Sequence, residues 1–146
     1  MTTPITIKRS TFAIRFVAKL ARSEYLLITM KDYSTRFRAL VVGVLPKDSR
    51  IVMPRGDDGL MILATWRLPG DRFRPAKRSR MVRIAISQEA LEDYANASDG
   101  VRLASDERFV AWLRGQIDTF DPHHDAPLGV EPAPVTWPVG TRELNG

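Results

Sequence analysis

The chain has 146 residues, a formal net charge of +5 and no cysteine, which excludes disulfide bonds, thiolate nucleophiles and cysteine-ligated zinc. Its length and its 44% of hydrophobic residues are typical of one globular domain rather than of a disordered chain. The first residues form no apolar signal core, and no run nears the roughly 18 apolar residues of a membrane-spanning helix, so we expect a cytoplasmic protein with no membrane partner.

Charge divides the chain into two unlike parts. Residues 1–83 carry 18 Lys and Arg against 6 Asp and Glu, whereas residues 84–146 carry 4 Arg against 11 Asp and Glu. This asymmetry indicates an anionic partner for the first part, or association of oppositely charged faces, as in a homodimer. A GC-rich genome would also raise the arginine content, without any function.

Residues 10–23 allow two interpretations. As a helix they place Arg15, Lys19 and Arg22 in one polar stripe, opposite an apolar face. As a strand their apolar residues alternate almost as well. We favour the helix, and we take the stripe as a candidate surface for a protein partner.

The stretch that follows predicts a series of strands. Tyr25–Met30 is rich in residues that favour strands, and Phe37–Leu45 contains an apolar run typical of a buried central strand. Two further runs flank a turn rich in Gly and Asp, which predicts a hairpin from Ile51 to Trp66. Met81–Ile86 is the last predicted strand of this series, with apolar residues at alternate positions.

Two helices are predicted next. Ser87 is a good N-cap for a helix near 88–96. Ser105 is the expected N-cap of a second helix near 106–120, whose first turn carries two carboxylates that suit the helix dipole. The apolar stripe of this second helix consists of Phe109, Val110, Leu113, Ile117 and Phe120.

From Asp121 the composition changes, because five of the ten prolines fall in residues 122–138. We expect an extended, Pro-rich tail there, with Trp137 as an anchor for the domain surface or for a partner. The fold class that follows is α+β: a single domain at 1–120, with an antiparallel sheet and two or three helices packed on one face, followed by the tail at 121–146.

Residues 72–83 hold the densest positive charge of the chain and no carboxylate. Arginine and lysine bind phosphates, and an aromatic ring between arginines can stack on an unpaired base. A protein contact, a solvated loop, or neutralisation by the acidic second part of the chain are the alternatives. The candidate nucleic-acid-binding residues are Arg72, Phe73, Arg74, Lys77, Arg78, Arg80 and Arg83.

Residue types that carry catalysis occur only in patterns with simpler explanations. His123 and His124 are adjacent, so in an extended segment they point in opposite directions, and no third histidine exists. Asp57 and Asp58 lie between two glycines, as in a hairpin turn. The chain contains neither a glycine-rich phosphate loop nor the Gly-x-Ser-x-Gly motif of serine hydrolases. We expect a non-enzymatic protein with no metal and no cofactor.

Arg83–Tyr94 resembles the opening of ribbon-helix-helix DNA-binding modules, and Ser105–Leu113 resembles their second helix. The resemblance implies that two chains pair their strands and insert this ribbon into the major groove, with Met81, Arg83 and Ala85 facing DNA. The alternative is that this strand pairs within its own chain, which would leave no intermolecular ribbon.

The resemblance also implies that the N-terminus of the second helix lies near a phosphate. The residues that it places in a dimer core are Val82, Ile84 and Ile86.

These observations favour a small binding protein that contacts nucleic-acid phosphates through residues 72–83. The alternative is a protein-binding adaptor, accessory subunit or inhibitor of phage or mobile-element type in a bacterium. Such a protein would act on a larger protein complex and would use its tail and its exposed aromatic residues as anchors.

Overall fold

The computed structural model describes residues 33–55, 58–69, 77–127 and 129–145. The chain divides into two units, Met1–Tyr33 and Ser34–Gly146, and the architecture given below is that of the second. This second unit includes the whole segment that the sequence analysis separated as a tail. The predicted strand Tyr25–Met30 lies outside the described residues, and so does the predicted polar stripe of Arg15, Lys19 and Arg22.

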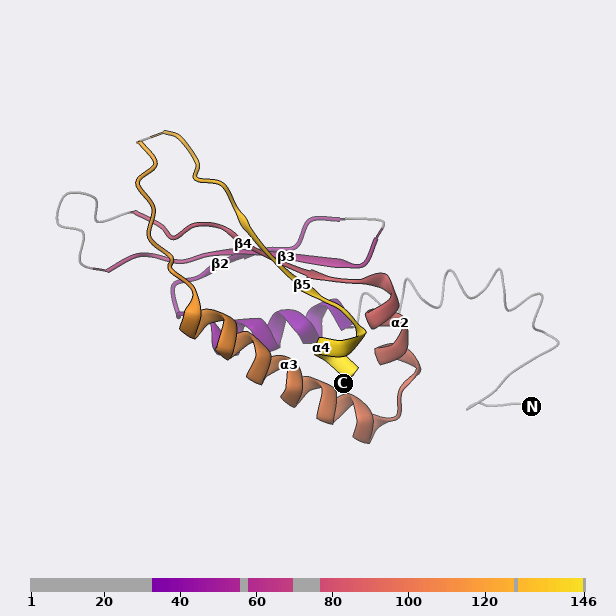
Figure 1. The fold of residues 1–146 in the computed structure, drawn as a ribbon. Helices are drawn as coiled ribbons and strands as arrows, with labels where there is room; N and C mark the ends of the chain where they lie inside the picture. The colour runs from indigo at the N-terminus through magenta and orange to yellow at the C-terminus, as the bar shows by residue number, and fades with distance from the viewer. Residues whose placement is uncertain (1–32, 56–57, 70–76, 128, 146) are drawn as a thin grey trace, which may run out of the picture. The chain divides into compact units, whose positions relative to one another are not determined.

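The described strands form one mixed sheet in the order β2, β3, β4, β5 (Figure 1). Strands β2 (Arg50–Val52), β3 (Leu60–Thr65) and β4 (Val82–Ile86) are antiparallel neighbours, whereas β5 (Val135–Val139) runs parallel to β4. The predicted α+β class is confirmed, as are the hairpin and the strand that follows it. The sheet is not antiparallel throughout, because its fourth strand comes from the C-terminal segment.

A glycine makes the hairpin turn possible. Gly59 has a φ of 79°, a left-handed conformation that side chains with a Cβ rarely adopt. A Cβ at this position would lie 2.1 Å from the carbonyl oxygen of Ile86, at the end of β4. The hairpin therefore approaches the neighbouring backbone at a point where only glycine fits.

Residues 33–44 form a helix, so the predicted strand at Phe37–Leu45 is wrong. Phe37, Val41 and Leu45 are buried at intervals of four residues, whereas Val42 is 50% exposed. This spacing is that of a helix with one buried face rather than that of a strand buried on both faces. The unbroken apolar run concealed the period.

The next two helices are α2 (Gln88–Asn96) and α3 (Asp99–Thr119). Ser87 caps α2 as predicted, with its Oγ accepting the amide of Ala90 at 3.1 Å. Helix α3 begins earlier than predicted, because Ser98 and not Ser105 is its N-cap. Ser105 is instead buried within the helix, where its hydroxyl contacts Asn145.

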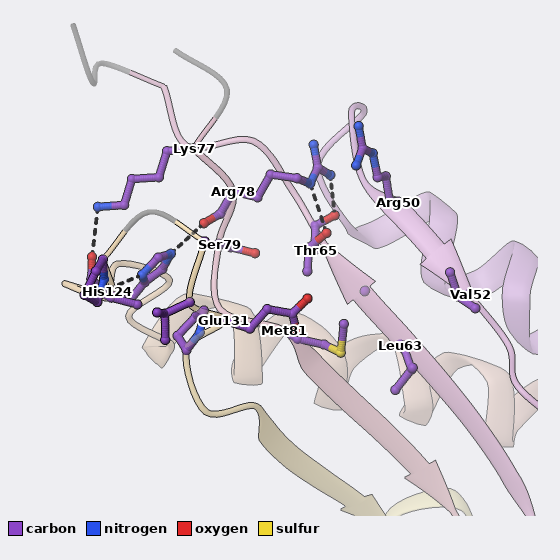
Figure 2. A pocket seen from close by; sticks show the side chains of 16 residues that line it. Arg50, Val52, Leu63, Thr65, Lys77, Arg78, Ser79, Met81, His124 and Glu131 are labelled. Atoms are coloured by element: carbon purple, nitrogen blue, oxygen red, sulfur yellow. Dashed lines mark hydrogen bonds between the residues drawn. The ribbon is translucent and has the colours of Figure 1, made fainter. Parts of the chain in front are cut away.

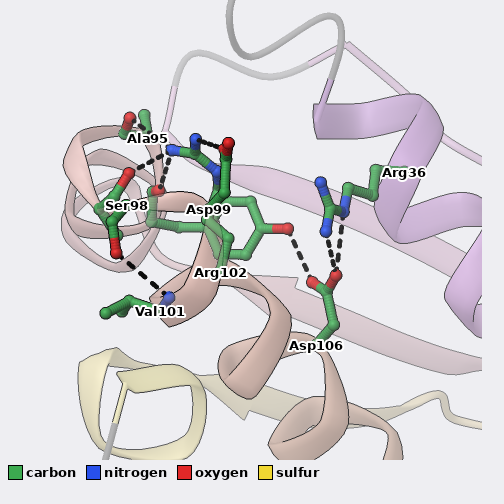
Figure 3. Close-up of polar contacts among 9 residues, drawn as sticks. Arg36, Ala95, Ser98, Asp99, Val101, Arg102 and Asp106 are labelled. Atoms are coloured by element: carbon green, nitrogen blue, oxygen red, sulfur yellow. Dashed lines mark hydrogen bonds and ion pairs between the residues drawn. The ribbon is translucent and has the colours of Figure 1, made fainter.

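Polar contacts fasten the helices to one another (Figure 3). The carboxylate of Asp106 on α3 accepts the Tyr94 hydroxyl of α2 at 2.7 Å and the Arg36 Nε of the preceding helix at 2.9 Å. The guanidinium of Arg102 donates to the carbonyls of Ala95 and Ala97 at the end of α2. These bonds satisfy groups that a helix end leaves without intrahelical partners.

The C-terminal segment is not an extended tail along its whole length. Residues 135–145 form β5 and the short helix α4 (Thr141–Asn145). Trp137 is only 6% exposed and Leu144 is fully buried, so this segment contributes to the core. Pro134 and Pro138, on either side of Trp137, obscured the strand in the sequence. Proline is tolerated there because β5 stands at the end of the described sheet.

The described helices all cover one face of the sheet, as predicted (Figure 1). Alternate residues of the strands are buried there, including Ile62, Ile84 and Val139. Two aromatic clusters fill the space between sheet and helices. One cluster consists of Phe37, Tyr94 and Phe109, and the other of Trp66, Phe120 and Trp137.

Candidate nucleic-acid interface

The face of the sheet opposite the described helices, here called the open face, carries both apolar and basic side chains. Val52, Leu63 and Arg83 stand in one row across β2, β3 and β4, because the strand register pairs them. Val52 is 58% exposed and Arg83 is also exposed. Arg50 occupies the next row of this face, opposite Thr65.

A pocket of about 840 Å³ lies between the open face and the loop that leads into β5 (Figure 2). Val52, Leu63 and Met81 form its apolar sheet side, and Pro127 and Pro132 lie on its loop side. The charged and imidazole groups of the lining are three cations, the ring of His124 and one carboxylate, that of Glu131. The cations are Arg50, Lys77 and Arg78.

Arg78 is held in place by neutral oxygens. Its Nε donates to Thr65 Oγ1 at 3.0 Å, and its Nη2 donates to the carbonyls of Thr65 at 2.8 Å and Asp48 at 3.1 Å. Burial lowers the pKa of Arg78 most, the nearby Arg50 cation lowers it further, and the Asp48 carboxylate partly opposes both. Two guanidinium groups thus lie close together at one side of the pocket, a placement that a bound anion would stabilise.

The loop beside the pocket is tied to the segment before β4. Lys77 Nζ donates to the His124 carbonyl at 2.8 Å, and the amide of Arg80 donates to the Pro122 carbonyl at 3.0 Å. The amide of Ala126 donates to His124 Nδ1, so the Nε2 of the neutral ring carries the proton and donates to the Arg78 carbonyl at 3.0 Å. These contacts give the pocket a defined wall.

Of the predicted nucleic-acid-binding residues, the structure brings some together and leaves others undescribed. Lys77 and Arg78 line the pocket, and Arg83 extends from the same face of the sheet. Arg80 lies outside the lining, near Asp121, whose pKa is lowered mainly by the amide of His123 and to a small extent by Arg80. The residues outside the described part of the chain are Arg72, Phe73 and Arg74.

Neutralisation of these cations by the protein's own carboxylates was one of the alternatives to nucleic-acid binding. Within the described ranges, no carboxylate lies within 4 Å of the charged groups of Lys77, Arg78, Arg80 or Arg83. In particular, the acidic residues of α2 do not pair with them, and Glu92 instead accepts from Gln88. This set of cations therefore has no ion-pair partner in the described part of the protein.

Sequence reasoning missed the contribution of β2 and of the loop. Arg50 lies nearly thirty positions from Arg78 in the sequence, and only the pairing of β2 with β3 brings the two together. Leu63 looked like an ordinary strand residue, and only the ribbon-helix-helix resemblance placed Met81 on the side that faces DNA. The signal available was their alternation with Ile62 and Val82, which places them on the opposite face of the sheet.

The ribbon-helix-helix resemblance implies that β4 pairs with the same strand of a second chain, and β4 has no free edge for such pairing. Both edges of β4 are occupied within the chain, by β3 on one side and by β5 on the other. Val82, Ile84 and Ile86 are buried as expected, but they face the helices of their own chain. Ser105, which would have started the second helix, lies inside α3.

Two further features of the described residues bear on function. No group of three or more His, Cys, Asp or Glu side chains in the parts that the structure describes could hold a metal ion. In the same ranges, no helix is both long and apolar enough to cross a bilayer. Comparison of the chain with protein-family models, with curated proteins and with solved structures finds no match.

Proposed function

We propose that the protein binds nucleic acid and that Arg50, Lys77, Arg78 and Arg83 contact its phosphates. The observation that carries the proposal is a group of cations on one face of the sheet that, among the residues the structure describes, forms no ion pair with a carboxylate. The hydrogen bonds that Lys77 and Arg78 donate to described residues go to neutral carbonyl and hydroxyl oxygens. Their charge is therefore not offset by an ion pair within the described ranges, and nucleic acid is the polymer that presents anions at regular intervals.

The test replaces Arg50 and Arg83 together by glutamate. Both side chains are exposed, so the double variant R50E/R83E should fold. We expect affinity for a fluorescent oligonucleotide, measured by anisotropy at low salt, to fall by more than about tenfold. The slope of log K against log salt is negative, and its magnitude should fall by about 1.5, because two phosphate contacts are lost.

The matched control is R38E/R114E, which makes the same change in net charge on the helices. Arg38 and Arg114 are exposed on the helix at 33–44 and on α3, across the sheet from the open face. This control should retain most of the affinity. An equal loss in the two double variants would mean that net charge alone governs binding, and it would contradict the proposed surface.

A protein-binding adaptor was the alternative function. It used an extended tail with Trp137 as an exposed anchor, and it included the stripe of Arg15, Lys19 and Arg22, which lies outside the described residues. Because Trp137 is buried against Phe120 in the core, no observation on this segment supports that alternative.

A further inference from the structure

The pocket on the open face has an interior that phosphate binding alone does not require. Val52, Leu63 and Met81 give it an apolar side on the sheet, and Pro127 and Pro132 face them from the loop. Phosphate contacts need only cations on an accessible surface. An apolar recess beside such cations suits a ligand with an apolar body and a charged backbone.

The form of nucleic acid decides whether such a recess can be filled. A duplex keeps its bases stacked inside and presents its phosphates and groove edges to the protein. In a single strand the bases can leave the stack and lie against protein side chains. The volume of about 840 Å³ lies within the range of pockets that enclose small organic ligands, so it is large enough for a nucleoside.

We propose that this pocket takes a nucleoside of a single-stranded nucleic acid, with the base between Met81 and Leu63 on one side and Pro127 and Pro132 on the other. The inference rests on the proposed function and assigns it to single strands. Arg50 lies at one end of the pocket and Lys77 at the other, so the phosphates before and after the nucleoside each meet a cation (Figure 2).

The fixed wall of the pocket supports this arrangement. His124 and Lys77 join the loop to the segment before β4 through hydrogen bonds of 3.0 and 2.8 Å. The recess is thus bounded by two chain segments that are already tied together, and less conformational freedom is lost when a base enters. Pairing of β2 with β3 holds Arg50 on the same face of the sheet.

The experiment compares a fluorescent single-stranded oligonucleotide with its duplex at equal salt. Anisotropy should show at least about tenfold tighter binding of the single strand, because only its bases can enter the pocket. The double variant L63A/M81A should weaken single-strand binding by about tenfold through lost apolar contact and change duplex binding little. Its control is M61A, which truncates a residue of the same face that does not line the pocket.

A second measurement does not depend on the stability of these variants. With methyl-labelled methionine in the wild-type protein, the Met81 methyl resonance should shift strongly when the single strand is added, and the Met61 methyl should not. Equal affinity for the two nucleic-acid forms, or an unchanged Met81 resonance on single-strand binding, would overturn this inference and leave the proposed function intact. No binding of either form would reject the proposed function itself.

Discussion

Arg78 shows how a cation can be held in position and still remain available to an anion. Its hydrogen bonds to Thr65 and to the Asp48 carbonyl fix the guanidinium but do not cancel its charge. The lowered pKa reflects burial first and the neighbouring Arg50 second. Two like charges kept close together destabilise each other until an anion lies between them, so binding would relieve a cost that the free protein carries.

Gly59 provides a test of the hairpin at the same scale. Gly59→Ala would place a Cβ 2.1 Å from the Ile86 carbonyl oxygen and would hold alanine at a positive φ. We expect the free energy of unfolding in urea to fall by more than about 2 kcal/mol, since the backbone strain and the clash add.

Gly129 is the natural control for this substitution. It has a similar φ of 82°, but a Cβ there would meet nothing within 4 Å. Gly129→Ala should therefore cost only the backbone strain, about 1–2 kcal/mol. Equal stability of the two variants would contradict the close approach of the hairpin backbone to the Ile86 carbonyl of β4.

At the scale of elements, the sequence identified those whose pattern was unambiguous. Strand β4 alternates buried and outward residues, and Ser87 stands directly before α2, so both could be predicted. The helix at residues 33–44 could not be predicted, because the apolar run Leu40–Leu45, interrupted only by Gly43, suits a buried strand as well as a helix. Which of them face the core is decided by the packing of Phe37 against α2 and α3, and that contact is absent from any local pattern.

The start of α3 gives a prediction for this scale. Two serines compete for the role of N-cap, and the structure selects Ser98, whose Oγ accepts the Val101 amide at 3.3 Å. Ser98→Ala should lower the free energy of unfolding by about 1 kcal/mol, whereas Ser98→Asp should keep it because aspartate caps equally well. Chemical denaturation of the two variants checks this, and a neutral Ser98→Ala would contradict the observed helix start.

At the scale of the whole molecule, the candidate site joins segments that are far apart in the sequence. Charge density alone indicated Lys77, Arg78 and Arg83. It could not indicate Arg50 or the loop at 124–132, because strand pairing and the return of the chain to form β5 bring these segments together. The apolar interior of the pocket was hidden for the same reason, since alternation assigns Leu63 and Met81 to one face of the sheet but does not show that the loop before β5 lies against them.

The role of Trp137 separates the two descriptions of the C-terminal segment most sharply. As an exposed anchor its loss would leave the fold intact, whereas the structure buries its ring against Phe120, between the sheet and the helices. Trp137→Ala should therefore lower the free energy of unfolding by about 3–5 kcal/mol, as for other large aromatic residues removed from a core. Thr136→Ala, at the exposed neighbouring position, should change it by less than about 0.5 kcal/mol. Urea unfolding followed by circular dichroism measures both, and a Trp137→Ala protein as stable as the wild type would mean that β5 does not complete the core.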